Sequence, residues 1–332
     1  MPFSPVPYRF AMWSLLQIIL PVCGLIAVGT ATRVFGLVRA DADETIGDFV
    51  FKIAIPCLLF RLIATANLED IDPWRIWGTY FISVALVWLM AGVLLPILFK
   101  REMLYGVIGS VASTFANTVM IGIPVIMQAY GERGMVAFTI LLSVHLPVML
   151  FATTLHHDLA QWIDGKGGIE GQTLFQKVSK FVLSIVKNPI LIGIMLGALV
   201  RLSGLTMPAI LLDVTGKISA VAGPMALIVL GMGLTRYGIK GNIGPAFVTT
   251  FLKLMVHPAL VFVLGAMVFD LPPIFTASLV ITAASPAGVN SYLFAQHFGT
   301  GQALSSNSIS ISTVGCVLTM TFWLAVLAAY FN

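Results

Sequence analysis

Long apolar runs separated by short polar segments are the dominant pattern of this chain. A helix that crosses a membrane needs about 20 predominantly apolar residues, and about ten segments meet that requirement. A transmembrane β-barrel would instead show alternating segments of about ten residues, whereas these runs are continuous and longer. The pattern therefore predicts an all-α polytopic membrane protein. The predicted spans cover residues 11–31, 46–66, 76–99, 104–129, 135–155, 183–203, 207–235, 244–269, 273–297 and 304–330.

Composition supports this class and excludes a water-soluble domain. The chain has 332 residues, of which 58% are hydrophobic and 10% are charged, and its mean hydropathy is +0.99. Soluble domains carry about 25% charged residues. A soluble fold of this size could not bury so much apolar surface.

The distribution of Lys and Arg predicts an orientation in the membrane. With the N-terminus outside and ten spans, eleven of these residues fall on the cytoplasmic side and six on the outer side. Cytoplasmic loops carry the excess of positive charge in membrane proteins. This orientation places the longest polar link, residues 156–182, in the cytoplasm. The net charge of +4 follows from this bias, so it does not predict nucleic-acid binding.

Two spans are interrupted by helix-breaking and polar residues. Span four contains Asn-Thr-Val-Met-Ile-Gly-Ile-Pro at 117–124, and span nine contains Ser-Pro-Ala-Gly-Val-Asn at 285–290. Broken helices are tolerated at membrane depth only where the break is buried in protein or lines a cavity. Two breaks in corresponding positions of two halves are the best sequence indication of a transporter's binding site. The candidate substrate-binding residues are Asn117, Thr118, Gly122, Pro124, Ser285, Pro286, Gly288, Asn290 and Ser291.

The positions of the interruptions predict an internal repeat. The 156–182 link, with an interfacial helix expected near its end, separates a first half of five spans (1–155) from a second half of five spans (183–332). An odd number of spans in each half makes the second half enter from the opposite side, so we expect inverted repeats. Prolines also match within spans two and seven. These positions, Pro56, Pro224 and the adjacent Met225, are expected to line the site from the scaffold side.

Polar residues occur inside two further spans. Lys253 lies near the middle of span eight, and His257 follows one turn later on the same face. A lysine at mid-helix costs about 2.5–3.5 kcal/mol on insertion scales, so it needs a partner. Three interpretations stay open: a counter-charge for an anion, a group that titrates during transport, or a side chain that reaches the cytoplasmic interface. In span ten, the Ser- and Thr-rich run 305–313 is expected to pack on span nine and satisfy its freed backbone groups.

Motifs for enzymatic or nucleotide chemistry are absent from the sequence. No phosphate-binding G-x-x-x-x-G-K-[ST] loop, no H-E-x-x-H and no metal-ligand cluster occur. We therefore expect neither an enzyme nor a cofactor nor a metal, and transport would draw its energy from a gradient.

Short motifs along the whole chain resemble the auxin efflux carrier family, in particular its bacterial malonate or dicarboxylate carriers. The resemblance implies two inverted five-helix repeats whose broken helices 4 and 9 cross, as in bile-acid transporters and sodium/proton antiporters. It implies a scaffold of spans 1, 2, 6 and 7 and a transport domain of spans 3–5 and 8–10, in a bacterial inner (plasma) membrane. It also implies that Asn117 and Asn290 hold a carboxylate. The matching stretches are Phe-Ala-Asn-Thr at 115–118, Gly-Ile-Pro at 122–124, Asn-Pro-Ile at 188–190, Pro-Met-Ala-Leu at 224–227, Leu-Gly-Met-Gly-Leu at 230–234 and Ala-Ser-Pro-Ala at 284–287.

The sequence therefore predicts a secondary transporter of a small, malonate-like organic anion that works by alternating access at the helix 4/9 crossover. Its expected partners are the carboxylate, the lipid bilayer and a coupled proton or sodium ion, with a homodimer left open. A cation/proton antiporter is the first alternative, although the spans lack buried acids. A membrane ligand sensor that does not transport is the second.

Overall fold

The computed structural model is almost entirely helical. It describes residues 12–39, 41–65, 71–166, 187–234, 241 and 243–331. Within these ranges the only strand-like feature is one isolated antiparallel bridge between Ala116 and Ala287. The expected interfacial helix and most of the 156–182 link lie outside the described residues.

The helices follow the predicted apolar runs. In the first half they are α1 (Met12–Val34), α2 (Ala42–Phe49), α3 (Ile55–Thr65), α4 (Pro73–Phe99), α5 (Met103–Thr114) and α6 (Ile123–Ile163), with π-helical turns η1 (Val50–Ala54) and η2 (Thr118–Gly122). In the second half they are α8 (Pro189–Ser203), α9 (Ala209–Ala220), α10 (Ala222–Gly233), α11 (Gly244–Phe251), α12 (His257–Val263), α13 (Pro273–Ala284), α14 (Asn290–His297) and α15 (Gln302–Phe331), with η4 (Leu252–Val256) and η5 (Leu264–Val268).

One boundary differs from the prediction. The sequence predicts that the polar link starts at residue 156, yet α6 continues as a helix to Ile163. Residues 156–163 mix polar and apolar side chains, and none of them is a glycine or proline that would end a helix. Gly131 instead makes the turn inside α6, with φ at 61°, where glycine carries no steric penalty.

Six helical segments of the described chain are long and apolar enough to cross a membrane. Three further apolar helices, α5, α8 and α13, are shorter than a full span. Two of these, α5 and α13, are short because they end at the predicted breaks. These features are those of a polytopic membrane protein.

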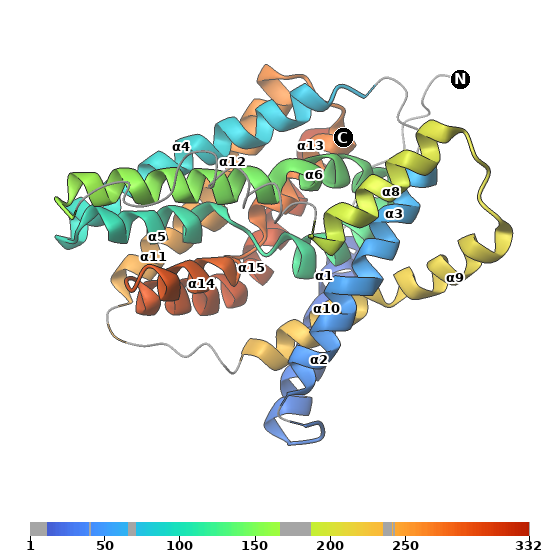
Figure 1. Ribbon diagram of the computed structural model, residues 1–332, viewed down its shortest axis with the longest axis horizontal. Helices are drawn as coiled ribbons and strands as arrows, with labels where there is room; N and C mark the ends of the chain where they lie inside the picture. The colour runs from blue at the N-terminus through green and yellow to red at the C-terminus, as the bar shows by residue number, and fades with distance from the viewer. Residues whose placement is uncertain are drawn as a thin grey trace.

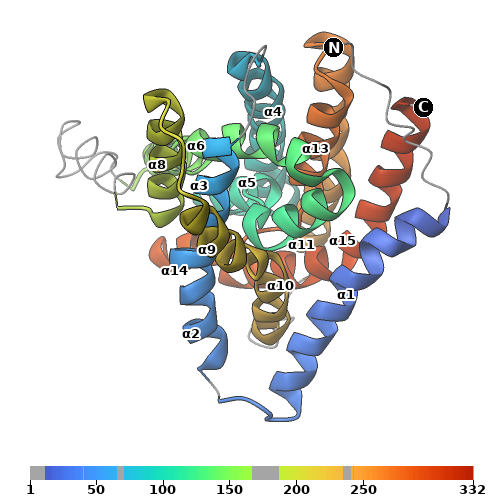
Figure 2. The same ribbon diagram turned by 90° about the vertical axis from the view of Figure 1, so that its right-hand side faces the viewer.

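The helices form two groups (Figure 1). In one group α1 packs along α10, and α3 packs along α8 and α9. In the other group α4 packs on α5, α13 packs on α6 and α12, and α15 packs on α11. Figure 2 shows α2, α3 and α8 on one side of α10 and α1 on the other.

Glycines allow the closest helix contacts in the first group. A Cβ atom at Gly193 of α8 would lie 2.5 Å from the carbonyl oxygen of Pro56, and one at Gly231 of α10 would lie 2.1 Å from that of Ile26. Only glycine permits backbones to approach this closely, as small residues do throughout membrane helix interfaces. These contacts fix α8 on α3 and α10 on α1.

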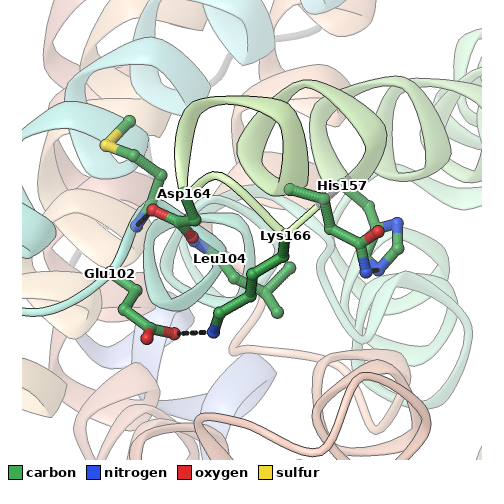
Figure 3. Close-up of polar contacts among 7 residues, drawn as sticks. Glu102, Leu104, His157, Asp164 and Lys166 are labelled. Atoms are coloured by element: carbon green, nitrogen blue, oxygen red, sulfur yellow. Dashed lines mark hydrogen bonds and ion pairs between the residues drawn. The ribbon is translucent and has the colours of Figure 1, made fainter. Parts of the chain in front are cut away.

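Polar contacts fasten the end of α6 to the start of α5 (Figure 3). The Asp164 carboxylate accepts hydrogen bonds from the backbone N–H groups of Met103 at 2.9 Å and Leu104 at 3.0 Å. Beside it, the Lys166 ammonium lies 2.5 Å from the Glu102 carboxylate. The first N–H groups of a helix have no partner within the helix, so Asp164 supplies a cap to α5 from a distant part of the sequence.

Candidate functional site

Backbone hydrogen bonds join the two breaks to each other. The N–H of Asn117 donates to the carbonyl of Pro286 at 2.7 Å. The N–H of Gly288 donates to the carbonyl of Phe115 at 2.9 Å. Each break therefore supplies a hydrogen-bond partner for an N–H and a carbonyl of the other break. Non-helical backbone inside a membrane protein needs such partners. The breaks predicted from the sequence meet in the structure.

Serines of α15 support the second break, as the polar run in span ten predicts. The Ser312 hydroxyl accepts a hydrogen bond from the N–H of Ala287 at 3.0 Å. The hydroxyls of Ser291 and Ser305 lie 2.6 Å apart, and Ser291 also donates to the carbonyl of Gly288. These contacts confirm that α15 packs on the break and satisfies its backbone.

A cavity of about 230 Å³ opens beside the first break. It lies between the two groups of helices, because η1 and α8 line one side and η2, α6 and the start of α14 line the other. Its lining residues are Phe51, Phe115, Ala116, Asn117, Thr118, Val119, Leu142, His145, Leu146, Asn188, Ile190, Leu191, Gly288, Val289 and Asn290.

Three helices begin at this cavity, and each begins with an asparagine. The Oδ1 atom of Asn117 accepts from the N–H of Met120 at 3.4 Å, which caps η2. The Oδ1 atom of Asn188 accepts from the first turn of α8, at 2.9 Å from the N of Ile190. Asn290 is the first residue of α14. The N-terminal ends of helices carry partial positive charge and exposed N–H groups, so they attract anions.

The lining is otherwise uncharged. Among the described residues that line the cavity there is no Asp, Glu, Lys or Arg, and His145 is the one ionisable side chain. Three amide groups, one hydroxyl, one imidazole and three helix starts thus supply the polar groups of an otherwise apolar wall. This arrangement suits a small anion with several hydrogen-bond acceptors.

The predicted site residues divide between the cavity and its support. Asn117, Thr118, Gly288 and Asn290 line the cavity. The other predicted residues of the two breaks do not line it and are buried behind it. They are Gly122, Pro124, Ser285, Pro286 and Ser291.

The predicted scaffold-side residues lie away from this lining. Pro56 is buried in the contact between α3 and Gly193 of α8. Pro224 and Met225 lie on α10. The residue before them, Gly223, approaches the first break, since a Cβ atom added there would lie 3.7 Å from Cγ of Pro124. The scaffold surface nearest the cavity is instead the start of α8 together with Phe51.

Lys253 and His257 lie outside the cavity lining and are fully buried. The Lys253 ammonium donates to the carbonyl of Ala283 at 2.5 Å and lies 3.3 Å from Nδ1 of His257. Ala283 is in the last turn of α13, where the helix dipole places partial negative charge. The lysine therefore binds the carbonyl end of a broken helix.

Four polar or aromatic lining residues are not among the predicted site residues: Phe51, Phe115, His145 and Asn188. Asn188 is followed by Pro189, a pair typical of a helix start, and its hydrogen bonds to the first turn of α8 show that it caps this helix. The sequence does contain a signal for Asn188. Like Asn117 and Asn290, it is an asparagine next to a helix start, and this likeness could have placed it in the site. For His145 and Phe51 the sequence offers no comparable indication.

Comparison with known proteins shows which proteins this chain resembles. A family model described as "Membrane transport protein" matches residues 14–324. An uncharacterized transporter of Methanocaldococcus jannaschii is 23% identical over 315 residues, covering 93% of this chain and 97% of the relative. A protein of Rhizobium meliloti named "Putative malonate transporter" is 22% identical over 320 residues, covering 93% and 95%. The chain belongs to this membrane transport protein family, the auxin efflux carrier family.

Proposed function

We propose that this protein is a secondary transporter of a small carboxylate anion, which it binds in the cavity beside the crossed breaks. The observation that carries the proposal is the convergence of three helix N-terminal ends, with Asn117, Asn188 and Asn290, on one cavity without charged lining residues. Helix starts and amide groups donate hydrogen bonds to carboxylate oxygens. The name of the Rhizobium meliloti relative favours malonate as the first substrate to test.

The proposed architecture has ten spans in two inverted five-helix repeats, residues 1–155 and 183–332. The scaffold would comprise α1 to α3 and α8 to α10, and the transport domain would comprise α4 to α6 and α11 to α15. The separate packing of these two groups supports the division. The position of the cavity between them supports it as well, because a site at such a boundary can open to either side when one group moves.

Alternating access would then follow from movement of the transport domain against the scaffold. Because the sequence carries no nucleotide-binding loop, the gradient of the substrate or of a coupled ion would supply the energy. The proposed setting is a bacterial inner membrane, with the N-terminus outside and the 156–182 link in the cytoplasm.

Uptake by reconstituted protein tests the proposal. Proteoliposomes loaded with malonate should take up labelled malonate by saturable exchange, which a channel or a sensor would not do. Asn117→Ala and Asn290→Ala should each abolish this exchange because both remove an amide from the cavity. Gln128→Ala is the matched control, since Gln128 carries an exposed amide on α6, and it should exchange like the wild type. If both asparagine variants exchanged malonate at the wild-type rate, the proposed binding site would be wrong.

A further inference from the structure

His145 is placed to add a charge to the cavity. It lies on α6, lines the cavity and is 2% exposed. Its Nε2 atom has no hydrogen-bond partner among the described residues. Buried polar atoms almost always have a partner, so an unpaired one beside a cavity suggests a missing ligand.

The neighbours of His145 come from several helices. The ring of Tyr80 on α4 lies 5.5 Å from the imidazole, and Phe115 at the first break lies 5.4 Å from it. Tyr80 also contacts His257, with ring centroids 5.3 Å apart, and His257 adjoins Lys253. The titratable groups on this side are therefore Tyr80, Lys253 and His257, and none of these described neighbours is an acid.

The negative charge of a bound malonate would need compensation in the cavity, and His145 could provide part of it. A malonate dianion brings two negative charges into a site within the membrane protein. Each helix start contributes roughly +0.5 of an elementary charge, so three contribute roughly +1.5. About half a negative charge then stays uncompensated. A protonated imidazole would more than offset it, and its N–H would form a charge-assisted hydrogen bond to the carboxylate. Without a bound anion that proton would have no negative partner.

We propose that His145 takes up one proton from solvent when a carboxylate binds, so that anion and proton occupy the cavity together. The available acceptor is Nε2, and the resulting N–H donates to the carboxylate with no covalent change in the substrate. This inference rests on the proposed function, because it assigns the coupled ion of that same site.

Calorimetry of malonate binding to the purified protein tests it. Measured at one neutral pH in two buffers with different ionisation enthalpies, the binding enthalpy should reveal uptake of about one proton per malonate in the wild type. His145→Gln should still bind malonate, more weakly, with about zero protons taken up. His297→Gln, on an exposed histidine of α14, is the matched control and should keep the wild-type uptake.

The outcomes separate the two proposals. No malonate binding by the wild type would overturn the proposed function and this inference with it. Malonate binding by the wild type without proton uptake would overturn the inference but not the proposed function. This measurement does not depend on whether His145→Gln folds. Proton uptake that persists in His145→Gln and disappears in His257→Gln would also overturn the inference, because it would identify His257 as the residue that takes up the proton.

Discussion

The two breaks share one backbone arrangement but differ in their surroundings. At the second break, α15 provides partners for Ala287 and Ser291, and Lys253 donates to the carbonyl of Ala283. Ser285 donates to the carbonyl of Ile281 in its own helix. At the first break, Asn117 and Val119 are half-buried and line the cavity. The second break is thus enclosed by its own half of the chain at residues 285–287, whereas residues 288–290 line the same cavity as the first break.

The matching positions of the breaks in the sequence would suggest that both support the crossing and both line the cavity to the same extent. Their surroundings differ in these two respects. Backbone groups with complete protein partners have none to offer a ligand. Residues 285–287 of the second break therefore support the crossing, and the polar side chains that the two breaks give to the cavity are Asn117, Thr118 and Asn290. Three sets of variants test this division.

The largest effect is expected from Lys253→Met, which keeps an apolar stem but removes the ammonium. The carbonyl of Ala283 then loses its charged donor, which should lower the free energy of unfolding by about 1.5–3 kcal/mol. Thermal unfolding in detergent measures this change. Lys52→Met is the control, because Lys52 forms an exposed pair with Asp48 and should change little. Unchanged stability with lost malonate binding would instead make Lys253 a substrate counter-charge.

The same substitution at a glycine in each break should have opposite effects. At Gly288 a Cβ would lie 3.0 Å from the carbonyl oxygen of Phe115, so Gly288→Ala should strain the crossing and destabilise the protein by about 1–3 kcal/mol. At Gly122 the nearest atoms lie 3.5 Å away, in ordinary contact, and the residue is helical. Gly122→Ala should therefore be neutral or stabilise by up to about 1 kcal/mol. Thermal unfolding of both variants checks this, and equal destabilisation would contradict it.

Asn188→Asp should leave stability almost unchanged while weakening anion binding. Aspartate caps a helix as well as asparagine does, so α8 keeps its start. The new negative charge in the cavity should raise the Kd for malonate at least about tenfold, or about 1.4 kcal/mol. Asn188→Ala separates the two roles, because it should cost about 1 kcal/mol of stability through the lost cap. Binding equal to the wild type in the aspartate variant would place the anion elsewhere, and improved cation binding would favour antiport.

The breaks could be predicted because Gly, Pro and Asn are conspicuous within long apolar runs. Their meeting could be predicted too, since freed backbone groups in a membrane protein need partners. The same need for partners explains why Asn188 caps α8 and why serines of α15 support the second break.

The composition of the cavity could not be predicted in the same way. A membrane helix is apolar on all sides, so the sequence does not show that His145 faces the breaks while other residues of α6 face lipid. The partner of Lys253 is a backbone carbonyl, which carries no sequence signal at all. Phe51 contributes to the cavity only through the packing of the two helix groups.

The bridge between the breaks has a consequence for the energetics of a transport cycle. Separating it would leave two N–H groups and two carbonyls without water to replace their partners, at several kcal/mol each. The crossing should therefore travel as one rigid piece that carries Asn117 and Asn290 with the ligand, whereas Asn188 stays with the proposed scaffold. In the proposed cycle the ligand would therefore keep these two asparagines on both sides of the membrane, and the net flux would reverse when the gradient reverses.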